Sequence, residues 1–371
     1  MLRVIRRVVG LGAVSVLLAL APGSATAQAP EGPRLSFVKL GPRPYPVTVM
    51  TLDQAGAQPH VLIRAFQRTR PFPLAVEGPA WFSDGSAFAF TGLTGSLWEG
   101  SGPGGMRIFV MDAEGGPPRP VAGTEGGQAP VVSPDGRTLA FARARERTRV
   151  ERRPGEYIEH VERNVSIWLV DIASGALRRL TTNRYGVEQF PTSFSPDGSV
   201  LAVTSVVQKK ATPRAFRRTR PPSVLALRLD GNGSETILRG ASSAVFSPDG
   251  SRIAYLRQGR KYREREEDGT STARITDLYV ARMDGSGPAR LTHSPRNGEA
   301  QLSRDPSGQR VAFLQLGRAS EFWEDFGAGD ALVQINADGT CRTKILSWPN
   351  AAIFGPSWQP GPGREAGRIS C

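Results

Sequence analysis

The feature of this sequence that most constrains its fold is one short string that recurs along nearly the whole chain. Full copies, reading Phe- or Val-Ser-Pro-Asp-Gly, lie at 132–136, 194–198 and 246–250, and degenerate copies begin at Phe82, Asp305 and Trp358. In a full copy, proline sets the φ angle of the first central turn position, and glycine takes a position that requires a positive φ. The string therefore predicts a hairpin turn, and its six copies predict a fold built from repeated units.

A strand with a small residue between two large ones follows five of these turns. The strands contain Phe88-Ala89-Phe90, Leu139-Ala140-Phe141, Leu201-Ala202-Val203, Ile253-Ala254-Tyr255 and Val311-Ala312-Phe313. Because side chains along a strand alternate between its two faces, the large residues fill one face and alanine lies on the other. We expect another sheet to pack closely on the alanine face.

A second motif in each repeat is an apolar strand that ends in an acidic, glycine-containing turn. Its copies span 47–56, 108–115, 167–175, 225–231, 278–285 and 332–339, and short strands such as 177–181 and 289–292 follow. Two hairpins per repeat predict a four-stranded antiparallel blade. The chain begins in mid-repeat and stops after the strand start 356–358, so pairing of the two ends completes a sixth blade. We predict an all-β fold: a six-bladed β-propeller closed by its N- and C-terminal segments.

The Ser-Pro-Asp-Gly turn, together with a strand ending in Met-Asp-x-x-Gly, resembles the WD40-like repeat of the TolB-like β-propeller family. The resemblance covers about residues 35–361 and concerns the type of repeat. The blade with a charged insertion before Ile167 is also similar to the propeller domains of prolyl-oligopeptidase-type peptidases. In those enzymes the propeller gates a separate catalytic domain.

The first 29 residues have the pattern of a secretory signal. Arg3, Arg6 and Arg7 precede an apolar run over 8–21, and small residues at 24–29 offer a cleavage site after Ala27 or Ala29. The run is shorter than the roughly 18–20 residues that a spanning helix needs. We therefore expect a signal peptide at 1–29, a propeller at 30–361 and a C-terminal tail at 362–371. The protein would be exported, in the periplasm, the cell envelope or the medium, without a transmembrane segment after cleavage or a lipid-anchoring cysteine.

The residue types that carry catalysis or bind metals are sparse. Cys341 and Cys371 are the two cysteines, which either form a disulfide or remain free thiols. His60, His160 and His293 fall in separate repeats without metal-ligand spacing, and no G-x-S-x-G nucleophile motif occurs. We expect no catalytic residue, metal or cofactor, and thus a non-enzymatic protein. The alternatives are a propeller enzyme of the lyase or lactonase type with a site at the channel mouth, and a stand-alone relative of the peptidase gating propellers.

The charge of the chain is concentrated in three insertions between second and third strands. The whole chain has a net charge of +13, and the insertions at 143–163, 208–222 and 257–274 carry +2, +6 and +2. Because equivalent insertions of successive blades lie on one face, they predict a basic face that binds a protein or an acidic envelope polymer. The partner-binding candidates are Lys209, Lys210, Arg214, Arg217, Arg218, Arg220, Arg260 and Lys261, with Trp98 and Trp323 in two further loops of that face. The alternative is a solvated face whose interleaved arginines and glutamates pair with each other. We expect a monomer that binds no nucleic acid.

Overall fold

The computed structural model describes residues 33–40, 47–53, 59–65, 74–93, 105–153, 156–207, 221–231, 233–266, 269–294, 298–316, 330–348, 351–361, 364 and 367–371. These residues form strands β1 to β24, and no α-helix occurs among them. Within these ranges no helix has the length and apolar character needed to cross a membrane.

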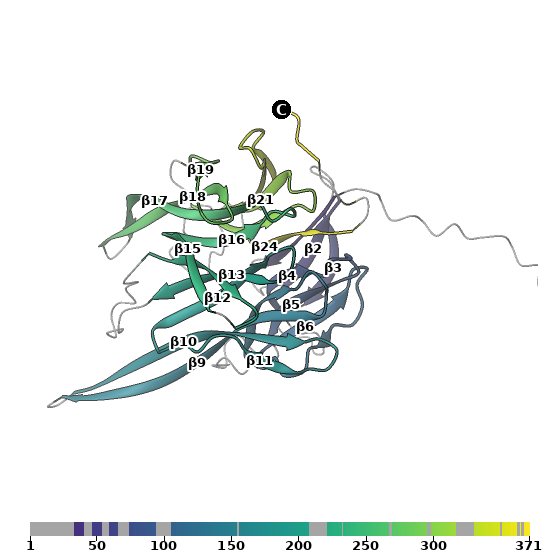
Figure 1. Cartoon of the computed structure of the whole chain (residues 1–371). Coiled ribbons are helices and arrows are strands. Elements are labelled where there is room, and N and C mark those ends of the chain that lie inside the picture. Colours follow the sequence, from purple (N-terminus) through teal and green to yellow (C-terminus); the bar gives the residue numbers. More distant parts are fainter. Residues whose placement is uncertain are drawn as a thin grey trace, which may run out of the picture. The chain divides into compact units, whose positions relative to one another are not determined.

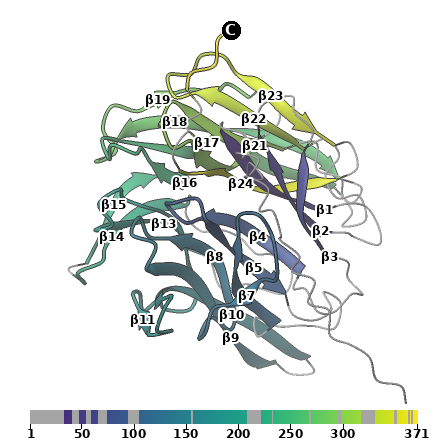
Figure 2. The same cartoon turned by 90° about the vertical axis from the view of Figure 1, so that its right-hand side faces the viewer.

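The strands pair in antiparallel groups of four that follow the chain (Figures 1 and 2). The group in the order β24-β1-β2-β3 consists of β24 (Ala352–Gln359), β1 (Arg34–Leu40), β2 (Val47–Leu52) and β3 (His60–Ala65). The next comprises β4 (Leu74–Trp81), β5 (Ala87–Leu93), β6 (Met106–Asp112) and β7 (Arg119–Pro120). A later group comprises β16 (Ala241–Phe246), β17 (Arg252–Glu266), β18 (Gly269–Arg282) and β19 (Ala289–Arg290). The last comprises β20 (Glu299–Arg304), β21 (Arg310–Gln315), β22 (Ala331–Asn336) and β23 (Thr343–Ser347).

The remaining eight strands form one continuous sheet. They are β8 (Gly127–Val132), β9 (Thr138–Arg153), β10 (Glu156–Asp171), β11 (Leu177–Arg179), β12 (Val187–Phe194), β13 (Val200–Val207), β14 (Ser223–Arg228) and β15 (Ser234–Arg239). A single parallel bridge, between Val165 of β10 and Glu188 of β12, joins β8–β11 to β12–β15. Apart from this bridge, each half has the same antiparallel pairing as the other groups.

The first strands of the groups contact one another in sequence. β4 contacts β8, β8 contacts β12, β12 contacts β16, β16 contacts β20, and β24 contacts both β20 and β4. β24 also pairs with β1, with Trp358 opposite Leu35, so strands from the two ends of the chain share a sheet. Figure 2 shows the yellow β24 beside the purple β1 to β3. This is the strand arrangement of a β-propeller.

The alanine faces of the second strands pack against the following sheet. Ala89 of β5 lies in one buried cluster with Leu139 and Phe141 of β9, and Ala202 of β13 lies in another with Ile253 and Tyr255 of β17. Ala140, Ala254 and Ala312 make the equivalent contacts in the other interfaces. Because alanine adds so little volume, the large residues of the next sheet approach the strand closely. The spacing of small and large residues therefore sets how the sheets stack.

A β-bulge recurs in five of the first strands, shortly before the turn string. Gly78, Ala129, Ser243, Gln301 and Gly355 have positive φ angles of 111°, 52°, 51°, 47° and 56° there. The backbone N–H of Ala129 donates to Thr91 Oγ1 at 3.2 Å, and that of Ser243 donates to Thr204 Oγ1 at 2.9 Å. Both threonines belong to the preceding sheet, so the bulge amides tie neighbouring sheets together.

Two insertions that we predicted as loops are strands. β9 and β10 pair continuously from Thr138 opposite Asp171 to Arg153 opposite Glu156, and β17 pairs with β18 as far as Glu266 opposite Gly269. Figure 1 shows the β9–β10 hairpin extending beyond the neighbouring strands. The prediction was wrong because long charged side chains are compatible with a strand when opposite charges and β-branched residues face each other across the ladder.

Candidate functional site

Most of the predicted partner-binding residues lie outside the described part of the chain. These are Lys209, Lys210, Arg214, Arg217, Arg218, Arg220, Trp98 and Trp323. Arg260 and Lys261 are described, and both are exposed on β17. They lie where the β17–β18 register shifts between Gln258 and Lys261. The structure therefore places this basic pair on the outer part of a long hairpin.

Opposite charges pair across the β9–β10 hairpin. Arg147 lies opposite Glu162, with Nη2 at 2.5 Å from Oε2, and Arg163 Nε lies 3.7 Å from Glu146 Oε1. Such cross-strand pairs contribute about 0.2–1 kcal/mol each at exposed positions. In this hairpin the acidic residues Glu146 and Glu162 are therefore matched within the ladder, as the solvated-face alternative expects.

The arginines nearest the sheet stack on aromatic rings. The guanidinium carbon of Arg143 lies 4.9 Å from the Trp168 ring centroid and that of Arg179 lies 5.8 Å from it. Arg147 lies 4.0 Å from the Tyr185 centroid. Burial lowers the pKa of Arg143. These contacts stabilise the packing of the three arginines on the rings.

A cavity of about 520 Å³ is lined by the ends of β4, β8, β12, β16, β20 and β24 and by the turn strings that follow them. The turn aspartates are engaged by their own turns. Asp197 accepts hydrogen bonds from Ser195 Oγ at 2.5 Å, Ser199 Oγ at 2.7 Å and Ser199 N at 3.1 Å. The hydroxyl of Ser195 and then that of Ser199 lower the pKa of Asp197 from 3.8 to about 2.

The histidines and carboxylates do not gather into a metal site within the residues that the structure describes. His60 Nε2 lies 3.4 Å from Asp53 Oδ2, and His293 is exposed. The side chain of His160 lies outside the described residues.

A buried polar cluster between β18 and β20 has no counterpart in the sequence predictions. Glu299 accepts hydrogen bonds from Thr292 Oγ1 at 2.6 Å and Ser294 Oγ at 2.9 Å, and burial raises its pKa. Asp277 accepts one from Arg290 Nη2 at 2.7 Å and one from Ser294 N at 3.0 Å. Arg290 to Thr292 form an Arg-Leu-Thr string that also occurs at 179–181. The recurrence of that string is a signal in the sequence that Thr181 and Thr292 have equivalent places in their repeats.

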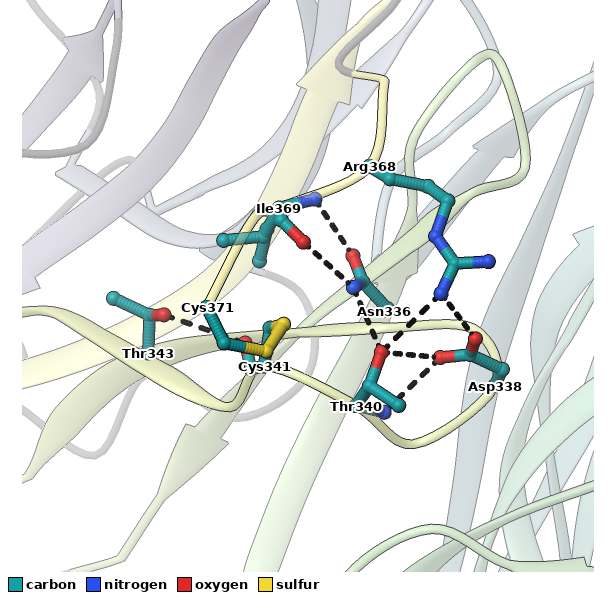
Figure 3. The surroundings of a disulfide bond; sticks show 8 residues. All are labelled: Asn336, Asp338, Thr340, Cys341, Thr343, Arg368, Ile369 and Cys371. Atoms are coloured by element: carbon teal, nitrogen blue, oxygen red, sulfur yellow. Dashed lines mark hydrogen bonds and ion pairs between the residues drawn. A yellow bond between two sulfur atoms is a disulfide. The ribbon is translucent and has the colours of Figure 1, made fainter.

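The C-terminal tail is fixed to the sheet β20–β23 (Figure 3). Cys341 and Cys371 form a disulfide with their Cα atoms 5.2 Å apart. The buried Asn336 donates from Nδ2 to the Ile369 carbonyl at 3.0 Å and accepts from Ile369 N at 2.8 Å. Arg368 pairs with Asp338, and Arg310 donates to the Gly367 carbonyl. Of the two alternatives for the cysteines, the structure contains the disulfide.

Comparison with curated proteins finds TolB proteins as relatives. No family model matches the chain. The Tol-Pal system protein TolB of Anaeromyxobacter dehalogenans strain 2CP-C is 28% identical over 173 residues, which are 44% of this chain and 34% of that protein. TolB of strain 2CP-1 of that species matches with the same identity and coverage. The chain thus spans about a third of the length of the curated relatives it matches.

Solved structures share the fold. A putative TolB from Agrobacterium tumefaciens superposes with a TM-score of 0.53 at 16% identity, covering 89% of this chain and 99% of that one. A chain of a nidogen/laminin complex has a TM-score of 0.51 at 10% identity, covering 88% and 98%. The repeats, the strand arrangement and these relatives agree: the chain has a β-propeller fold and is similar to the TolB proteins.

Proposed function

We propose that the protein is an exported, non-enzymatic propeller that binds a protein or an acidic envelope polymer through the basic insertions of one face. The observation that carries this proposal is the placement of the insertions. β9–β10 and β17–β18 extend from the same end of their sheets, and Arg260 and Lys261 are exposed on the second hairpin. The insertion at 208–222, between them in sequence, carries six basic residues and no acidic one. A face of this charge attracts acidic partners.

The proposal includes six four-stranded blades and the predicted division of the chain. The consecutive contacts of β4, β8, β12, β16, β20 and β24 support six blades, since β24 contacts both β20 and β4. The signal pattern at 1–29 supports export, with the propeller at 30–361 and the tail at 362–371. TolB is named for the Tol-Pal system, and this similarity supports a protein partner in the envelope. We expect a monomer.

The test is capture of partners from the native envelope and secreted fractions with three forms of residues 30–371. The first is unaltered, and the second carries R217E, R218E and R220E. The control carries R137E, R252E and R282E, which change the charge equally at exposed positions at the opposite ends of the strands. We expect one partner to be retained by the first and third forms and lost by the second, with retention that weakens as salt rises. Equal capture by all three forms, or by none, would contradict the proposal.

A further inference from the structure

A cavity of about 410 Å³ lies beneath the C-terminal tail, where β20–β23 meets the sheet containing β1 and β24. Its volume is within the range of about 300–1,000 Å³ that small-molecule sites occupy. Arg368, Ile369 and Ser370 of the tail form one wall. The disulfide and the paired hydrogen bonds between Asn336 and Ile369 hold that wall in place. The cavity is therefore a defined space with a fixed cover.

The cavity has an apolar side and a cationic side. Leu35 of β1, Leu52 of β2, Ile345 of β23 and Trp358 of β24 supply apolar surface. Arg310 of β21 and Gln334 of β22 supply polar groups, and neither aspartate nor glutamate is among the described lining residues. Sites of this composition orient a ligand with a few polar groups and bury its apolar part.

The guanidinium groups of Arg368 and Arg310, both at the cavity, differ in whether their hydrogen-bond acceptors are charged or neutral. Arg368 pairs with Asp338, a residue of the β22–β23 turn. Arg310 donates to the Gly367 carbonyl and, at 3.4 Å, to Gln334 Oε1, both of which are neutral. Burial lowers the pKa of Arg310, opposed by the charge of Asp305. The Asp305 carboxylate is itself engaged by Ser307 N and Arg310 N.

A partly buried guanidinium with neutral partners is most stabilised by an anion, and a carboxylate matches its planar donors. The Trp358 indole N–H, by contrast, has no hydrogen-bond partner among the described residues. We propose that this cavity is a binding site for a small amphipathic carboxylate, with the carboxylate at Arg310 and an alkyl body against Leu52, Ile345 and Trp358. The inference is independent of the partner proposed for the basic face.

Decanoate, titrated by calorimetry into residues 30–371 below its micelle concentration, tests the site, with decan-1-ol as the neutral counterpart. We expect one decanoate per chain and an affinity for decan-1-ol lower by about tenfold or more, because the charge-assisted hydrogen bonds are lost. R310Q should weaken decanoate binding by about the same factor and leave decan-1-ol binding unchanged. The matched control R137Q, at an exposed turn, should bind both as the unaltered protein does.

A second variant keeps the test decisive if R310Q does not fold. I345F fills the apolar side of the cavity and retains Arg310, so it should exclude both probes. Far-UV circular dichroism and the thermal midpoint establish that each variant is folded. No decanoate binding by the unaltered protein, equal affinity for the two probes, or undiminished binding by folded R310Q or I345F would overturn the assignment.

Discussion

The turn aspartates Asp197 and Asp249 have carboxylates that are exposed yet strongly hydrogen-bonded. Hydroxyl groups of Ser195 and Ser247, respectively, contribute most to lowering the pKa of each to about 2. An unfolded chain has the ordinary value of 3.8 and therefore binds protons first as the pH falls. The stabilisation by these carboxylates is complete above about pH 4 and is lost as the pH falls through about 2.

We predict that D197N lowers the unfolding midpoint at pH 7 and that its difference from the unaltered protein disappears near pH 2. Asparagine keeps the turn preference and an acceptor but removes the charge. The cost at pH 7 should be about 1 kcal/mol or less, because solvent screens the exposed group. Urea titrations between pH 2 and 7 measure it, and a difference that persists unchanged at pH 2 would refute this account. S195A combined with D197N should cost less than the sum of the two changes.

At the scale of elements, the second strands are packed on both faces, and their alanines set the separation of the sheets. We predict that A202L destabilises the protein by roughly 1–3 kcal/mol, because Ala202 is fully buried against Ile253 and Tyr255. A173L, at an exposed turn position, is the matched control and should change the free energy of unfolding by about 0.5 kcal/mol or less. Similar effects of the two variants in urea titrations would mean that the sheets do not meet at Ala202 as described.

The strands and turns could be predicted from the sequence because their signals are local. Proline, aspartate and glycine specify the turn at 196–198, and period-two alternation specifies the strand at 201–203. The bulge at Ala129 could not be predicted, since its amide is satisfied by Thr91, which is 38 residues away. The same holds for Asn336, whose partner Ile369 lies in the tail. For the candidate site, the sequence left Cys341 and Cys371 open between a disulfide and free thiols, and the cavity beneath the tail depends on how two sheets meet.

At the scale of the whole molecule, β24, near the C-terminus, pairs with β1 and completes the sheet that contains the first three strands. We predict that a chain ending at Trp348, which lacks β24 and the tail, loses cooperative unfolding and aggregates, because the edge of β1 and the buried Leu35 and Phe37 are exposed. A chain ending at Pro360 retains β24 and should stay soluble with a lower midpoint. Gel filtration and circular dichroism compare the two, and equal behaviour would mean that β24 does not stabilise the propeller.

The disulfide also stabilises the pairing of β24 with β1, because it restricts the unfolded chain. Cys341 and Cys371 are separated by 30 residues, and the loop they close contains β24. Crosslinking a loop of this length restricts the unfolded chain by about 3–4 kcal/mol in the chain-entropy treatment. Detachment of β24 from β1 then leaves that strand close to its pairing site.

We predict that the C341S/C371S double variant has a lower urea midpoint, and that a reductant lowers the midpoint of the unaltered protein to the same value without affecting the variant. Because the hydrogen bonds of Asn336 to Ile369 remain, the folded tail of the double variant should keep its position. We therefore expect its affinity for decanoate under native conditions to be nearly that of the unaltered protein. A reductant that shifts the variant as much as the unaltered protein would show that the disulfide is not the source of the effect.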